Sequence, residues 1–262
     1  MVDYWLLATL LGIGIVGGFV SGLLGLGGAI ILVPMLLYCP TCLGVGVLTM
    51  KQVAGITIIV VFASSLSGVL VHRKNQLVLK NLVLIMGITA VIAAFLGAVY
   101  SRHTTSDVLL IIFAFMAAFA AVMMFIPKKE ADKDVELETI GFSKSGAIVI
   151  SFAIGFIGGM VGAPGAYIFT PMMIYFLKIP TKVAIGSTLG IAFVASISGA
   201  IGKLVTGQVP YLLAAAVVVG AVPAARIGAM FTKKIPAQTL RRALAVVIAF
   251  AAIRMWWDVF TK

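Results

Sequence analysis

The chain has few charged residues for its length. Of its 262 residues, 10% are charged and 62% are apolar, whereas an average soluble domain is roughly 25% charged. This composition excludes an ordinary soluble enzyme, a disordered chain and a nucleic-acid binder, because the apolar surface exceeds what one compact core can bury. We therefore expect a protein whose main solvent is lipid.

Cysteine and histidine are also scarce. Two cysteines cannot crosslink a fold of this length, and the C-x-x-C pair Cys39 and Cys42 is interpreted as two incidental thiols or a local disulfide. His72 and His103 are too separate to predict a metal site, and no cofactor is expected. No nucleophile elbow, phosphate-binding loop or HExxH motif occurs, so the chain is not expected to be an enzyme.

Acidic residues are absent from the long apolar stretches. The chain has eight Asp and Glu against 19 Lys and Arg, and all eight acids lie outside the predicted membrane spans. Cation carriers and proton relays usually keep an acid within the membrane. This absence favours an anion as the cargo.

What the chain does have is a series of apolar segments long enough to cross a bilayer. They cover residues 4–38, 52–71, 82–100, 108–126, 146–177, 183–205, 211–231 and 240–257. The one strongly charged run, 127–138, lies in the middle and is typical of a solvated linker. We predict a first membrane repeat at 1–126, a cytoplasmic linker at 127–145 and a second membrane repeat at 146–262.

The two halves share a duplicated motif. With a shift of 137 residues, Gly18-Phe-Val-Ser-Gly-Leu-Leu-Gly-Leu-Gly-Gly28 aligns with Gly155-Phe-Ile-Gly-Gly-Met-Val-Gly-Ala-Pro-Gly165. A shift of 131 aligns Lys51 with Lys182 and Thr57 with Thr188. Internal duplication of this kind is typical of secondary transporters.

The first segment of each half is too long for a single span. A helix over residues 4–38 would measure about 50 Å, well beyond the hydrocarbon thickness. The glycine cluster in the middle of each segment predicts a break there, because glycine and proline interrupt helices. Each first segment is therefore expected to be a hairpin or a pair of short helices that returns to its starting side.

The positive charges favour the returning arrangement. If each first segment returns, fourteen Lys and Arg lie on one side of the membrane, and the other side keeps Lys51, Arg102, Lys203, Arg254 and Lys262. Cytoplasmic loops carry the excess of basic residues. We therefore predict an all-α polytopic membrane protein of two inverted repeats, each with a broken or hairpin first segment and three transmembrane helices. Both termini are expected outside.

The glycine clusters are candidate substrate-binding elements. A broken helix leaves unpaired backbone N–H groups and a positive terminus, which suit an anion. The residues concerned are Gly25, Gly27, Gly28, Gly162, Pro164 and Gly165. Packing is the alternative role for these residues, and it is the expected role for the small-residue ladder Gly14, Gly18 and Gly22 that leads into the first cluster.

Lysines and hydroxyls just after each break complete the candidate site. Lys51 and Lys182 each precede an apolar helix, where either an anion or snorkelling at the interface accounts for them. Thr57 and Thr188 follow on those helices, as do Ser64, Ser65, Ser67, Ser187, Ser196 and Ser198. These hydroxyls could donate to a passing oxyanion, but bonding to the preceding turn or a neighbouring helix is the expected role for most.

On these duplicated motifs, with Pro34 and Pro171 after them, the chain resembles the TauE/SafE family of sulfite and organosulfonate exporters, also called the 4-toluenesulfonate uptake permease family. The resemblance covers nearly the whole chain. It implies a small sulfur-containing anion as cargo but no direction of transport. Ala163-Pro164 in the second half departs from Leu26-Gly27, which predicts two unequal half-sites.

The expected function is transport, most simply export, of such an anion by alternating access around one site near the midplane. Lys51 would attract it from outside and Lys182 from the cytoplasm. The alternatives are an uptake permease for another small organic anion and a non-transporting membrane scaffold. The expected location is the inner membrane, and the expected partners are the anion and the lipid bilayer, with no nucleic acid and with a homodimer left open.

Overall fold

The computed structural model describes residues 4–24, 28–74, 78–125, 141–163, 165–232 and 234–261. These residues are helical and contain no strand, which confirms the all-α class. The elements are α1 (Tyr4–Leu24), α2 (Ala29–Cys42), α3 (Met50–Lys74), α4 (Lys80–Tyr100), the 3-10 helix η1 (Ser101–His103), α5 (Ser106–Phe125), α6 (Lys144–Val161), α7 (Ala166–Tyr175), α8 (Thr181–Val205), α9 (Tyr211–Thr232) and α10 (Ala237–Thr261).

Six of the described helices are long and apolar enough to cross a membrane, namely α1, α4 with η1, α5, α6, α8 and α9. Helix α2 and the first part of α3 are shorter apolar helices. Large apolar side chains such as Leu84, Val149, Val219 and Phe250 are exposed on the outside of the bundle. A surface of this kind is stable in lipid and not in water. The chain is a multi-pass membrane protein.

The first segment of each half is broken and turns back. Near the start of α1, the Leu6 side chain lies 3.6 Å from the point that a Cβ on Gly46, just after α2, would occupy. Near the start of α6, the same position on Gly146 lies 3.8 Å from Leu177, just after α7. Each pair of helices therefore ends close to the level at which it began, and the predicted break is confirmed.

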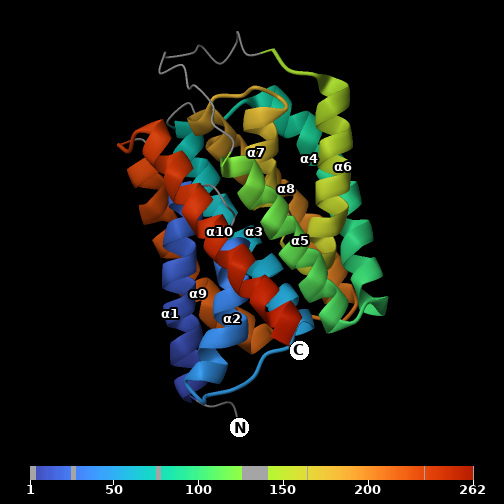
Figure 1. The fold of residues 1–262 in the computed structure, drawn as a ribbon, viewed down its shortest axis with the longest axis vertical. Coiled ribbons are helices and arrows are strands. Elements are labelled where there is room, and N and C mark those ends of the chain that lie inside the picture. The colour runs from blue at the N-terminus through green and yellow to red at the C-terminus, as the bar shows by residue number, and fades with distance from the viewer. Residues whose placement is uncertain are drawn as a thin grey trace.

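Figure 1 shows α1 beginning and α10 ending at one end of the bundle, called the lower end here, and α6 beginning at the opposite, upper end. Because α2 returns to the lower end, α3 also begins there. Gly55 near the start of α3 packs on the backbone of Gln208, just before α9, so α9 begins at the lower end as well. Helices α3 and α9 thus run in the same direction.

Packing between the helices follows the sequence repeat. The helices α1, α3, α5 and α9 correspond to α6, α8, α10 and α4. Helix α1 packs along α9 as α6 packs along α4, and α3 packs on α9 as α8 packs on α4. The pairs α3–α8 and α5–α10 each join two corresponding helices. Individual contacts repeat too, since Gly18 lies against Ala221 and Gly155 lies against Ala90. These positions are related by the shifts of 137 and 131. The two halves therefore meet through equivalent surfaces.

The glycine ladder of α1 packs on one face of α9. Each glycine lies against the backbone carbonyl of one α9 residue, in the pairs Gly14–Val217, Gly18–Ala221 and Gly22–Ala225. A Cβ on any of the three would overlap that carbonyl, so the two helices can approach this closely only without a side chain. The predicted packing role of the ladder is confirmed.

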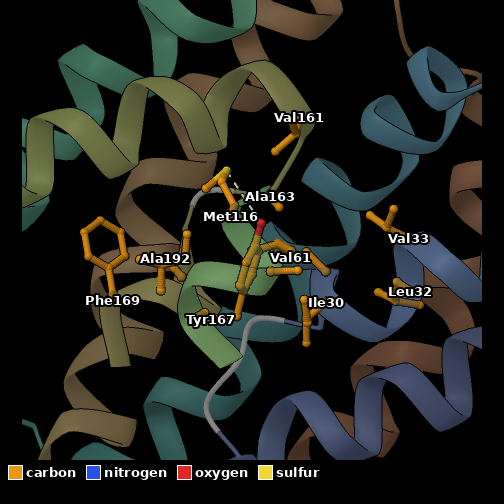
Figure 2. Close-up of a cluster of buried hydrophobic side chains, with 14 of the residues drawn as sticks. Ile30, Leu32, Val33, Val61, Met116, Val161, Ala163, Tyr167, Phe169 and Ala192 are labelled. Atoms are coloured by element: carbon orange, nitrogen blue, oxygen red, sulfur yellow. Dashed lines mark hydrogen bonds between the residues drawn. The ribbon is translucent and has the colours of Figure 1, made fainter. Parts of the chain in front are cut away.

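Apolar side chains fill the middle of the bundle around Tyr167 (Figure 2). The Tyr167 side chain is fully buried, its hydroxyl donates to Met116 Sδ at 3.7 Å, and its ring centroid lies 5.5 Å from that of Phe113. Ile30 of α2 and Val61 of α3 belong to the same core. The Tyr167 core thus joins helices of both halves.

Candidate functional site

The break of the second half is held against α3. Gly162 ends α6 with a φ of 72°, and its Cα lies directly against the backbone of Ala54. Gly165 precedes α7 with a φ of 70°, and its carbonyl accepts the N–H groups of Ile168 and Phe169, both at 2.8 Å. No side chain caps α7. The positive end of a buried helix therefore begins at this break.

The break of the first half has the same form. Gly28 precedes α2 with a φ of 83° and no side-chain cap, and it is buried. The positive φ accounts for glycine at this position, since a side chain would be strained there. Gly25, Gly27 and Pro164, which are also predicted site residues, lie outside the described residues.

The level of the second-half break can be measured along α3. Phe62 and Phe193 lie at the midpoints of α3 and α8 and stack with ring centroids 5.6 Å apart, which marks the centre of the bundle. Gly162 packs on Ala54, eight residues before Phe62. At a rise of 1.5 Å per residue this break lies about 12 Å below the centre.

The first-half break lies on the other side of the centre. Thr232, the last residue of α9, donates to the carbonyl of Leu23 in the last turn of α1 at 2.9 Å. Because α9 begins at the lower end, its last residue lies toward the upper end. The ends of α1 and α6 therefore lie at different depths, and the two breaks are called the upper and the lower half-site. The expectation of one shared site near the midplane stays a prediction.

A buried lysine lies at the lower half-site. Lys203, near the end of α8, is 0% exposed. Its Nζ donates to Ser101 Oγ at 2.7 Å, to Gln208 Oε1 at 2.9 Å and to the Met160 carbonyl at 3.0 Å. Met160 belongs to the last turn of α6, so the cation lies at the negative end of that helix. All three of these acceptors are neutral oxygens.

Lys51 reaches the same small element. Its Nζ donates to the carbonyl of Arg102 at 3.1 Å, next to the Ser101 that Lys203 contacts. Three of the five cations assigned by sequence to one side of the membrane, Lys51, Arg102 and Lys203, thus gather around η1. Asp107 is the one acidic residue whose side chain the structure describes, and it is exposed on α5. Basic side chains therefore outnumber acidic ones around η1 among the described residues.

Lys203 is the residue that sequence reasoning missed. It lies inside the predicted span 183–205, two residues from the end, where a lysine is ordinarily expected to snorkel to the interface. Its position within an apolar segment was the available signal. Burial could not be predicted, because Ser101 and Met160 come from other parts of the chain.

The other predicted residues are distributed between the two ends. Lys182 is half-buried in the first turn of α8, which runs antiparallel to α3 and so begins at the upper end, opposite Lys51. Thr57 is buried and donates to the Val53 carbonyl of its own helix at 2.8 Å. Thr188 accepts a hydrogen bond from Thr170 of α7 at 3.1 Å. The structure does not bring Thr57 and Thr188, or Lys51 and Lys182, to one place.

The two cysteines are free. Cys39 and Cys42 both lie on α2, and no disulfide joins them. The sequence interpretation allowed either two incidental thiols or a local disulfide, and the structure shows the two thiols unbridged.

The apolar outer surface and the membrane-spanning helices define a polytopic membrane protein. Residues 10–255 match the family described as sulfite exporter TauE/SafE. The chain belongs to this family, as the duplicated motifs predicted.

Curated relatives are similar over nearly their whole length. The probable membrane transporter protein YunE of Bacillus subtilis is 26% identical over 261 residues, covering 94% of this chain and 96% of the relative. The probable membrane transporter protein YdhB of the same species is 27% identical over 243 residues, covering 90% of this chain and 94% of the relative. A probable membrane transporter protein of Methanocaldococcus jannaschii is 23% identical over 265 residues, covering 95% of each chain.

No solved structure matches this chain significantly. The family and the relatives identify a membrane transporter, which fits the expectation that the chain is not an enzyme.

Proposed function

We propose that this transporter moves a small sulfur-containing anion, such as sulfite or an organosulfonate, out of the cell across the inner membrane. The observation that carries the proposal is the buried Lys203 beside the break between α6 and α7, with neutral oxygens as its three acceptors. A buried cation is costly unless an opposite charge is nearby. An anion entering the break would supply that charge, and the name of the family supports a sulfur oxyanion.

The two half-sites suggest how the anion would pass through the bundle. An anion at the lower half-site would contact the positive start of α7 and the field of Lys203 and Lys51. An anion at the upper half-site would contact the start of α2, with Lys182 near that end. The Tyr167 core joins helices of both halves and would have to open and close around the anion. Rocking of one half against the other is the motion proposed for this step.

The equivalent surfaces of the two halves support the inverted repeat that this motion requires. Exchange of corresponding helices preserves the packing pattern, and α1 and α6 begin at opposite ends of the bundle (Figure 1). We assign the lower end, with both termini, to the outside of the cell because fourteen of the 19 basic residues are assigned by sequence to the other side of the membrane.

Flux through purified protein in liposomes tests the proposed function. Liposomes loaded with sulfite or methanesulfonate should release the anion much faster than protein-free liposomes, and a divalent cation should not be released faster. A folded protein that releases none of several sulfur oxyanions, sulfonates and carboxylates would contradict the proposal and favour the scaffold.

A further inference from the structure

Three buried serine hydroxyls in the first half have no hydrogen-bond partner within the described structure. They belong to Ser21 of α1 and to Ser64 and Ser65 of α3, whose side chains are 1%, 1% and 0% exposed. Buried polar groups are nearly always paired, because an unpaired one keeps the full cost of leaving water. Three such groups in one half of the chain point to something that pairs with them when it is bound.

Two serines of α8 in the second half, of which Ser196 stands at an equivalent position, are paired. Ser196, which corresponds to Ser65 by the shift of 131, donates to the Phe193 carbonyl at 2.7 Å. Ser198 donates to the Val91 carbonyl of α4, also at 2.7 Å. Such bonds are the usual solution for a serine inside a helix. Among the buried serines whose side chains the structure describes, the unpaired ones all belong to the first half.

Ser21 lies at the start of α2. Its Oγ is 3.4 Å from the point that a Cβ on Gly28 would occupy, and Gly28 is the uncapped residue before this 14-residue helix. The Gly28 carbonyl accepts the N–H groups of Ile31 and Leu32 at 3.1 and 2.9 Å. The N–H groups of Ala29 and Ile30, the first two residues of α2, have no carbonyl within the helix to pair with. A hydroxyl and a positive helix end thus meet at one point.

The register of α3 brings Ser64 and Ser65 to the same level. Thr170 of α7 contacts Thr188 of α8, and the corresponding positions on α2 and α3 are Val33 and Thr57. From Val33, counting back along α2 toward the upper end, Gly28 is five residues away. Over a similar rise, α3 leads forward about two turns from Thr57 to the two serines. Ser64 shares the face of Thr57, and Ser65, as the next residue, points about 100° away from Ser64.

We propose that Ser21, Ser64, Ser65 and the N-terminus of α2 form an oxyanion-binding half-site that prefers singly charged sulfonate-type anions. This inference rests on the proposed function and names the binding groups at its upper half-site. Each hydroxyl donates one hydrogen bond, and a sulfonate or hydrogensulfite group offers three oxygens. A hydroxyl also accepts, so it pairs with the acidic proton of hydrogensulfite.

The preference for one negative charge follows from the groups that surround this half-site. The positive charge at a helix end is about half an elementary charge, and the neighbouring donors are neutral. The second half differs, because Gly158 replaces Ser21 there and Lys203 supplies a full charge. The two half-sites are unequal. The upper one would leave the second negative charge of a dianion poorly compensated.

Binding measurements on the purified full-length protein test this proposal. Calorimetry with methanesulfonate, and with sulfate as the dianion, would compare the wild type with Ser21→Ala and with the double variant Ser64→Ala, Ser65→Ala. Loss of hydrogen bonds to a charged ligand should weaken methanesulfonate binding about ten-fold or more in each variant. Sulfate should bind the wild type more weakly than methanesulfonate.

Ser196→Ala is the matched control, since this buried serine already has a partner and should leave the affinity unchanged. The melting temperatures of the Ser21 and Ser64/Ser65 variants should equal or exceed that of the wild type, because an unpaired hydroxyl is removed. Wild-type affinity in these variants, as expected if water alone fills the site, would overturn the inference and leave the proposed function intact. Weakened binding in the variants with no flux in liposomes would support the half-site and sink the transport proposal.

Discussion

At the scale of single residues, Lys203 and the unpaired serines separate the two halves of a duplicated chain. The position that corresponds to Lys203 is His72, and the one that corresponds to Ser21 is Gly158. In the proposed path each half-site would therefore offer an anion different groups, a lysine at the lower level and neutral hydroxyls at the upper. The prediction of unequal half-sites from Ala163-Pro164 gains a chemical basis in these residues.

Replacing Lys203 by methionine should separate a transport role from a structural one. Exchange of a buried charge for an apolar group of similar size is often neutral or stabilising, so the melting temperature of Lys203→Met should not fall. Anion flux in liposomes should fall at least about ten-fold, since an interaction with a charged group of about 1.5–3 kcal/mol is lost. The exposed Lys80 provides the control Lys80→Met, which should retain wild-type flux. Unchanged flux in Lys203→Met would show that this charge serves folding alone.

At the scale of helices, small residues determine how the elements approach and where they break. Gly28 and Gly165 adopt positive φ values before α2 and α7, and the ladder of α1 lets its backbone touch that of α9. Lipid supplies no hydrophobic force between helices, so close packing has to provide the attraction. The same residue type therefore makes two different contributions within one segment.

The ladder can be tested with two alanine substitutions on α1. A Cβ on Gly18 would overlap the backbone of Ala221, whereas a Cβ on Gly12 would meet no atom within 4 Å. Gly18→Ala should destabilise the protein by about 1–3 kcal/mol through overpacking. Gly12→Ala should leave the melting temperature close to that of the wild type. Equal melting temperatures for the two variants would contradict the close contact between α1 and α9.

At the scale of the whole molecule, the charges and the repeat describe one arrangement. At the upper end, Lys80, Lys144 and Lys182 each lie at the start of a helix. At the lower end, Lys51, Arg102 and Lys203 lie around η1. The two groups lie at opposite ends because the first segment of each half returns to the end at which it began. The orientation assigned from the charge asymmetry remains a prediction about the membrane itself.

Labelling of single cysteines checks that orientation. In a chain with Cys39→Ser and Cys42→Ser, the exposed positions Arg102 and Lys144 lie at opposite ends and can each receive a cysteine. A membrane-impermeant maleimide should label Arg102→Cys on intact cells, and Lys144→Cys only after the inner membrane is permeabilised. The opposite pattern would reverse the assignment of the two ends.

Much of the fold could be predicted because its determinants are local. The length of each apolar stretch, the glycine clusters at 25–28 and 162–165 and the missing acids are all properties of short segments. The candidate site was predicted only in part. Gly28, Gly162 and Gly165 do lie at helix ends at the two breaks, as predicted. Thr57 was less informative, because its hydroxyl bonds to its own helix.

The sequence by itself determined a membrane protein of helices, duplicated, with a break in each first segment and no acid in its spans. Tertiary structure decided the depth of the two breaks, the burial of Lys203 and the unpaired state of three serines. The physical reason is that burial and hydrogen bonding depend on partners from distant segments. Lys203 and Ser101, for instance, are 102 residues apart in the chain and 2.7 Å apart in the fold.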